Sequence, residues 1–257
     1  EKARIHDLGL AGVVFDPEQR RVYPLGALAA HLLGYDEKGG EPVAGAEKAL
    51  RDEILKAGAE GRPVALSIDV RVQAALEEEL ALAAAQYQPK GAVGVITNVQ
   101  TGEILGMASW PDFDPNYPGR ANPEQLRNRA AASVFEMGST FKAFTVAIGL
   151  DTQVATPDST FDASTPLKMG YRTIHDFHGT NRILTLREVF NHSSNIGTAK
   201  LALAVGADRM ARYFHALGLT KRAQVELLES TRPLTPKKRH LAEFMIEKGE
   251  VLKSGAS

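Results

Sequence analysis

The sequence predicts a mixed fold of the α/β (α+β) class, and three observations lead to this prediction. Segments with helical periodicity alternate with short strand-like runs along the chain. Two of these runs flank a turn and indicate a β-hairpin. Beyond the hairpin, residues 131–150 become almost wholly apolar after Gly138, which is typical of a helix packed inside a protein.

The composition is that of an ordinary globular chain. Of its 257 residues, 44% are hydrophobic and 24% charged, which is enough to bury a substantial core. The net charge of -1 gives no general attraction to nucleic acid or to an acidic membrane, and the short basic cluster at residues 237–240 is interpreted as a solvated loop. The absence of cysteine excludes a disulfide framework and a cysteine nucleophile. No apolar run reaches the roughly 18 residues of a membrane span.

The N-terminal region predicts two helices and then a domain boundary. A short helix covers residues 29–33 and ends at Gly34, and an amphipathic helix covers residues 46–57. Glycines and a proline interrupt the pattern over residues 58–63, where we place the boundary. The expected domains are residues 1–60 and residues 61–257.

The middle of the chain predicts a strand, a long helix and the hairpin. Residues 64–68 form a short apolar run that is interpreted as a strand. Asp69 is placed to cap a helix over residues 70–85. The two hairpin strands and the rigid loop after them are residues 91–97, 103–109 and 111–116.

The region after the apolar stretch predicts a surface insertion and three helices. Residues 156–178 are rich in Thr, Asp and Pro, which suits an irregular segment with short strands. The helices are expected at residues 184–191, 196–205 and 207–217, and Gly218 closes the last of them. The second of these helices consists of small and apolar residues, so we expect it to be buried.

Ser139 and Lys142 stand at the start of the apolar stretch, about one helical turn apart on the same face. A lysine inside such a helix is costly unless its charge is paired or removed, and burial lowers its pKa. A neutral Lys142 could take the proton of the Ser139 hydroxyl, while the N-terminal end of the helix stabilises an oxyanion. The alternative interpretation is an N-capping serine and a lysine whose charge reaches solvent.

Ser193 and Asn195 form a second feature, on a turn between two helical segments. A hydroxyl there could relay a proton, and the side-chain amide could donate to and accept from a substrate amide at once. The alternative is a plain helix N-cap.

A third feature, at residues 253–255, consists of Lys253, Ser254 and Gly255. It offers a positive charge, a hydroxyl and close backbone approach, which suit a substrate that carries a carboxylate. The alternative is a tripeptide of common residues without a role.

Together and in this order, the three features are the signature of penicillin-binding proteins and class A β-lactamases. Longer blocks of the sequence resemble class B penicillin-binding proteins, in particular the division-specific transpeptidase (penicillin-binding protein 3 type). The resemblance covers most of residues 10–235. The blocks that carry it are residues 21–24, 45–47, 66–73, 101–108, 112–116, 128–130, 135–142, 175–178 and 192–195.

This resemblance implies a serine-type D-Ala-D-Ala transpeptidase that cross-links peptidoglycan during septum formation. Ser139 would be the acylated nucleophile and Lys142 the base that takes its proton. Ser193 would relay that proton to the leaving D-alanine, and Asn195 would orient the donor stem peptide. The implied fold is a penicillin-binding/serine β-lactamase-like transpeptidase domain with a small N-terminal pedestal segment, residues 1–60.

The resemblance also implies the remaining contacts of the site. Lys253 and Ser254 would hold the carboxylate of the substrate or of a β-lactam, and the oxyanion hole would use the Ser139 N–H and an N–H just after Gly255. No metal or organic cofactor is implied. The implied partners are peptidoglycan stem peptides, β-lactams bound covalently at Ser139, divisome membrane proteins and a glycosyltransferase, with no nucleic acid.

Two features depart from the family pattern. Only 57 residues separate Asn195 from Lys253, whereas the family has a much longer segment there. Ala256 follows the third motif where the family usually has threonine. The stretch after Pro236 therefore reads as if pieces of the domain were missing. Because the chain begins at Glu1 with no methionine and no signal-like segment, we interpret it as a fragment, which is expected to be soluble. The resemblance implies a protein of the bacterial inner membrane whose catalytic domain lies in the periplasm, with a membrane anchor that is absent from this sequence.

Other classes of protein share parts of this pattern. An elongation-specific class B protein shares the mechanism and the pedestal. A serine β-lactamase would need a deacylating glutamate, and no Glu-x-x-x-Asn arrangement follows Ser193. A penicillin-sensing domain would keep the serine without turnover. An α/β-hydrolase is rejected because Met137 and Phe141 stand where its two glycines belong, and the histidines match no metal-ligand pattern.

Overall fold

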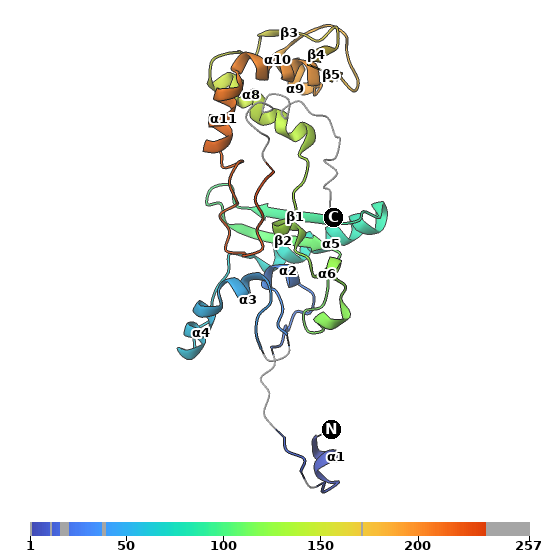
Figure 1. Ribbon diagram of the computed structural model, residues 1–257, viewed down its shortest axis with the longest axis vertical. Coiled ribbons are helices and arrows are strands. Elements are labelled where there is room, and N and C mark those ends of the chain that lie inside the picture. The colour runs from blue at the N-terminus through green and yellow to red at the C-terminus, as the bar shows by residue number, and fades with distance from the viewer. Residues whose placement is uncertain (1, 11, 16–20, 38–39, 171, 235–257) are drawn as a thin grey trace. The chain divides into compact units, whose positions relative to one another are not determined.

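The structure is a computed structural model that describes residues 2–10, 12–15, 21–37, 40–170 and 172–234. Helices and short antiparallel strands are mixed along the chain, so the predicted α/β (α+β) class is confirmed. Two compact units are present (Figure 1): Glu1–Ser133 with Gln224–Ser230, and Val134–Ala223 with the segment from Thr231. The domain boundary near residue 60 stays a prediction. Among the described helices, none combines the length and the apolar character that crossing a membrane requires.

The first unit is built around a long helix and a hairpin. Helix α5 (Val70–Tyr87) packs on strands β1 (Ala92–Thr97) and β2 (Ile104–Trp110), which pair antiparallel as predicted. The helix begins at the expected cap, since the Asp69 carboxylate accepts from the Arg71 N–H at 2.9 Å. The remaining elements of this unit are α1 (Lys2–His6), α2 (Ala30–Leu33), α3 (Gly45–Ala49), α4 (Arg51–Ala59), η1 (Pro118–Arg120), α6 (Pro123–Leu126) and α7 (Arg129–Ala132).

Two contacts seat α5 on the hairpin. Leu76 lies over Gly94 of β1, where an added Cβ would come within 2.5 Å of the leucine Cδ1. The buried Gln73 donates from its side-chain amide to the Met107 carbonyl (2.9 Å) and accepts from the Met107 N–H (2.8 Å). The amide therefore pairs with β2 much as the backbone of a neighbouring strand would.

The strand predicted at residues 64–68 does not form. The Ser67 hydroxyl donates to the Ile104 carbonyl at 2.7 Å, and the Asp69 N–H donates to the Leu105 carbonyl at 3.0 Å. The segment thus runs beside β2, but a side-chain donor replaces a backbone donor, so no regular ladder develops. The helix predicted at residues 46–57 is likewise divided into α3 and α4 at Leu50, whose φ of -106° is not helical.

The second unit consists mainly of helices, with short antiparallel strand pairs. Strand β3 pairs with β6, and β4 pairs with β5. Strands β3, β4 and β5 lie within residues 156–178, which were predicted to be irregular with short strands, and β6 follows that segment. The elements in order are η2 (Gly138–Phe141), α8 (Lys142–Asp151), β3 (Thr160–Asp162), β4 (Leu167–Met169), β5 (Arg172–Ile174), β6 (Ile183–Thr185), α9 (Leu186–Asn191), α10 (Asn195–Val205) and α11 (Ala207–Ala216).

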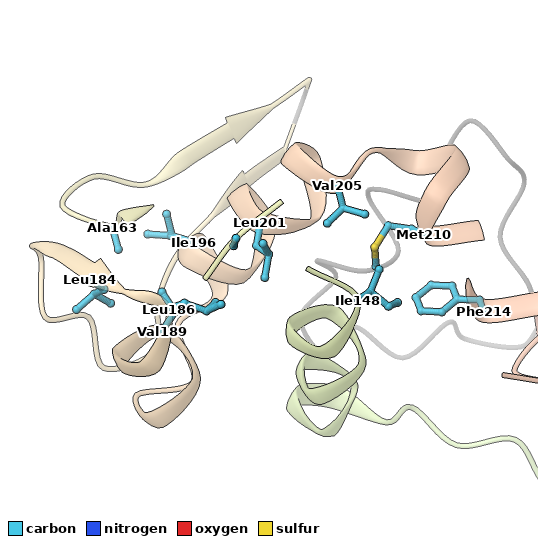
Figure 2. Close-up of a cluster of buried hydrophobic side chains, with 11 residues drawn as sticks. Ile148, Ala163, Leu184, Leu186, Val189, Ile196, Leu201, Val205, Met210 and Phe214 are labelled. Carbon is cyan, nitrogen blue, oxygen red and sulfur yellow. The ribbon is translucent and has the colours of Figure 1, made fainter. Parts of the chain in front are cut away.

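One hydrophobic core joins the helices of the second unit. Figure 2 shows Ile148 of α8 directed toward Met210 and Phe214 of α11. Two glycines allow the helices to approach closely. A Cβ on Gly149 of α8 would lie 2.7 Å from the Leu201 side chain of α10, and a Cβ on Gly197 of α10 would lie 2.5 Å from Val189 of α9. Helix α10 is therefore held between α8 and α9, and it is buried as predicted.

The apolar stretch differs from the predicted buried helix in two respects. It opens with the 3₁₀ turn η2, and α8 proper begins at Lys142. Its burial follows one face only, because that face packs on α10, whereas Leu150 remains 38% exposed. The buried residues of α8 are Lys142, Thr145, Ile148 and Gly149.

Helix α9 begins two residues later than predicted. Thr185 caps it, since its hydroxyl accepts from the Glu188 N–H and the Glu188 carboxylate accepts from the Thr185 N–H at 2.9 Å. This reciprocal capping box fixes the N-terminus of the helix, so that α9 begins at Leu186. Leu184, which was expected to be helical, belongs to β6 instead.

We expect the substitution Leu201→Ala to lower the free energy of unfolding by about 2–5 kcal/mol, because it empties space between tightly packed helices. Leu203, on the same helix, is 44% exposed, so Leu203→Ala should cost less than about 1 kcal/mol. Urea denaturation followed by circular dichroism measures both values. Equal losses for the two variants would contradict the packing of Leu201 between the helices.

Candidate active site

Ser139 and Lys142 both lie just after Gly138, in the second unit. Ser139 lies in η2 and is exposed, and Lys142, one turn further on, is the first residue of α8. Lys142 is buried, with 9% of its surface exposed. The serine hydroxyl is thus open to solvent while the lysine beside it in sequence is withdrawn from water.

Lys142 is in contact with the second predicted feature. Its Nζ donates to Ser193 Oγ at 2.9 Å, to Asn195 Oδ1 at 2.6 Å and to the Ser193 carbonyl. These three acceptors stand in the place of water around the buried nitrogen, and all three donor positions of an ammonium are used. The structure therefore brings together Lys142, Ser193 and Asn195, which are more than 50 residues apart in the sequence.

The turn before α10 has the geometry that this contact requires. Ser193 has a φ of +53°, in the left-handed region that residues other than glycine seldom occupy. The next residue, Ser194, caps α10 by accepting from the Gly197 N–H at 2.9 Å. The capping role that the sequence offered as the alternative for this motif belongs to Ser194, which leaves the Ser193 hydroxyl free to face Lys142.

Lys142 loses its proton more readily in this site than it would in water. Burial lowers the pKa of Lys142 to about 8, and the negative charge of Asp176 opposes that shift. A lysine with such a pKa exchanges its proton near neutral pH, as a general base must. The expected cost of burying this lysine is thus realised as a lowered pKa.

Ser139 makes no side-chain hydrogen bond to Lys142 within the described part of the chain. Ser139 precedes Lys142 by one turn, at the junction of η2 and α8, and it is exposed to solvent. Lys253, Ser254 and Gly255 lie outside the described residues. In the described segments, no cluster of three or more His, Asp or Glu side chains could hold a metal ion.

Asp176 contacts the site, although none of the three short sequence motifs includes it. The Asp176 carboxylate accepts from the Ser194 hydroxyl at 2.8 Å, on the turn that carries Ser193 and Asn195. The sequence did carry a signal, because residues 175–178 are one of the blocks that resemble the division-specific proteins. Spacing alone gave it no role, since it lies 17 residues before Ser193.

Comparison with known proteins identifies one sequence family. The family described as penicillin binding protein transpeptidase domain matches residues 92–249. The protein named "Probable peptidoglycan D,D-transpeptidase FtsI" of Caulobacter vibrioides is 66% identical over 93% of this chain and 41% of its own length. The gonococcal protein named "Probable peptidoglycan D,D-transpeptidase PenA" is 35% identical over 82% of this chain and 40% of its own length.

The fold is also similar to that of solved structures. Penicillin binding protein 3 of Mycobacterium tuberculosis, complexed with aztreonam, superposes with a TM-score of 0.77 at 28% identity. The similarity covers 90% of this chain and 55% of that one. The implied transpeptidase fold is therefore confirmed, and the chain spans about two fifths of the length of the curated relatives that it matches.

The lowered pKa of Lys142 makes the stability of the second unit dependent on pH. Between about pH 8 and the usual lysine pKa, the unfolded chain binds a proton that the folded chain has released, so the folded state gains stability as pH rises. We expect wild type to gain about 2–3 kcal/mol relative to Lys142→Met between pH 7 and pH 10. Urea denaturation of both proteins at the two pH values measures this gain, and groups that titrate equally in both cancel. A constant difference would show that burial does not perturb Lys142.

Proposed function

This chain belongs to the penicillin-binding protein transpeptidase family, and we propose that it is part of a class B peptidoglycan D,D-transpeptidase. The observation that carries the proposal is the buried Lys142, one turn after an exposed serine and in contact with Ser193 and Asn195. Such an arrangement supports serine acyl transfer, because it pairs a nucleophile with a base of lowered pKa and a hydroxyl that can relay a proton.

In the acylation step, Ser139 Oγ attacks the carbonyl carbon of the penultimate D-alanine of a stem peptide. Neutral Lys142 takes the hydroxyl proton as the Oγ–C bond forms. Ser193, hydrogen-bonded to Lys142 Nζ at 2.9 Å, passes a proton to the nitrogen of the departing D-alanine as the peptide bond breaks. The product is an ester on Ser139 and free D-alanine, so atoms and charge balance.

In the second step, the amine of another stem peptide attacks this ester. Its proton returns through Ser193 and Lys142 to Ser139 as the cross-link forms. Asn195 orients the donor peptide, because its Oδ1 and Nδ2 each retain one further hydrogen-bonding position beyond those already used. Lys253 and Ser254 hold the substrate carboxylate, and Gly255 permits close approach, with the Ser139 N–H in the oxyanion hole.

The proposal also covers the domains of the chain, its cellular location and its partners. Residues 1–60 belong to a non-catalytic pedestal, and residues 61–257 to the transpeptidase domain. The protein works on the periplasmic side of the bacterial inner membrane during septum formation, with divisome membrane proteins and a glycosyltransferase as partners. The 66% identity to a relative named FtsI favours this division role over the elongation role.

We expect benzylpenicillin to form a lasting covalent adduct on Ser139, because a β-lactam presents a strained amide to the same nucleophile and base. Intact mass spectrometry after incubation should show one adduct on wild type and none on Ser139→Ala. Lys142→Ala should slow acylation about 10²- to 10⁴-fold through loss of the base. Lys200→Ala, on the same unit but outside the described contacts of Lys142, is the matched control and should leave the rate near that of wild type.

The same experiment separates the alternatives. Rapid loss of the adduct with consumption of the antibiotic would indicate a serine β-lactamase. A stable adduct without transpeptidation of D-Ala-D-Ala peptides would indicate a penicillin-sensing domain. An adduct that persists on Ser139→Ala would contradict the assignment of the nucleophile.

A further inference from the structure

The carboxylate of Asp176 lies at the beginning of α10. Its Oδ2 accepts from the Ser194 hydroxyl at 2.8 Å, and its Oδ1 accepts from the Ile196 N–H at 3.0 Å. Both oxygens are therefore bound to the segment that carries the second motif. Hydrogen bonds to an ionised acceptor are stronger than neutral ones, so this is a firm attachment.

The neighbour of Asp176 adds a third contact. The Asn195 side-chain amide donates to the His175 carbonyl at 2.8 Å. Residues 175–176 thus hold three consecutive residues of the turn, Ser194, Asn195 and Ile196, from 18 to 20 positions away in the sequence. We call residues 175–176 the clamp.

The clamp binds the turn next to Ser193, whose backbone conformation is unfavourable. Ser193 has a φ of +53°, which costs free energy for a residue with a side chain, and such a conformation persists only when its surroundings impose it. In this conformation, the hydroxyl and the carbonyl of Ser193 both accept hydrogen bonds from Lys142 Nζ. If the turn adopted an ordinary backbone conformation, Ser193 would lose its contacts with Lys142.

The clamp also supplies charge. In the described part of the chain, Asp176 is the only charged group that shifts the pKa of Lys142, and it raises that pKa against the effect of burial. The direct contacts of Lys142 Nζ, Ser193 and Asn195, are neutral. Asp176 therefore acts on the base through space as well as through the turn.

We propose that Asp176 is a positioning residue for acyl transfer: through Ser194 and Ile196 it holds Ser193 and Asn195 against Lys142. This inference rests on the proposed function and deepens it. Asp176 itself touches neither the nucleophile nor Lys142 in the described contacts, so its effect is indirect.

The test is the second-order rate of acylation of Ser139 by benzylpenicillin, measured from pH 5 to pH 10 for wild type and Asp176→Asn. We expect the plateau rate of Asp176→Asn to fall about 10- to 100-fold, because the serine and the base are no longer aligned. Removing a negative charge lowers the pKa of an ammonium, so the acidic limb of the profile should also move to lower pH.

Two further variants separate position from charge. Ser194→Ala loses the hydrogen bond from Ser194 to Asp176, but the Asp176 carboxylate remains. The acylation rate of this variant should therefore fall, while the acidic limb of its pH profile stays at the wild-type pH. Asp162→Asn is the matched control, since Asp162 also accepts from a serine hydroxyl and a backbone N–H but is exposed. It should behave as wild type.

An unchanged rate for Asp176→Asn would overturn the proposal, and so would a lower rate with an unmoved limb, which a merely structural role would produce. If Asp176→Asn melts too low for assay, Asp176→Glu decides, because a longer side chain displaces the turn. A wild-type rate for that variant would overturn the clamp, and a reduced one would support it.

The two proposals can fail separately. Absence of acylation in wild type would refute the proposed function. The clamp would then be judged by the titration of Lys142 in ¹³C-lysine nuclear magnetic resonance spectra, with the signal assigned from Lys142→Met. A pKa that is lower in Asp176→Asn than in wild type supports the clamp, and an equal pKa overturns it.

Discussion

The contact of Lys142 with Ser193 and Asn195 is the constraint on which the second unit depends. A buried ammonium must find acceptors in place of water, and here all of those named come from a turn more than 50 residues away. The contact stabilises the unit only if α8 and α10 are correctly packed. The same packing lowers the pKa of the lysine, so the structural cost of burial and the chemical use of the residue have one origin.

The approach of the helices makes that contact possible. Gly149 and Gly197 lie where a larger residue would meet Leu201 or Val189, so α8 and α9 both pack directly on α10. Ser194 then serves α10 as its cap while it binds Asp176. Helix packing, capping and the clamp therefore act on the same few residues at the start of α10, and a change in one affects the others.

Prediction from the sequence succeeded where the signal was local. The Asp69 cap, the hairpin and the burial of α10 follow from nearest-neighbour chemistry and periodicity. It failed at residues 64–68, where the Ser67 hydroxyl takes the place of a backbone donor beside β2. It also placed the start of α9 too early, because both a strand and a helix suit Leu184 and only the capping box at Thr185 decides between them.

The sequence by itself determined the kinds of group in the site: a serine and a lysine one turn apart, and a second serine and an amide on a turn. These are local patterns, and a resemblance to a family extends them. Only the tertiary structure decided which groups meet, because contacts across 50 residues depend on how helices pack. It also revealed the left-handed Ser193 and the carboxylate of Asp176 beside it. Neither follows from spacing, since each depends on segments that approach only after folding.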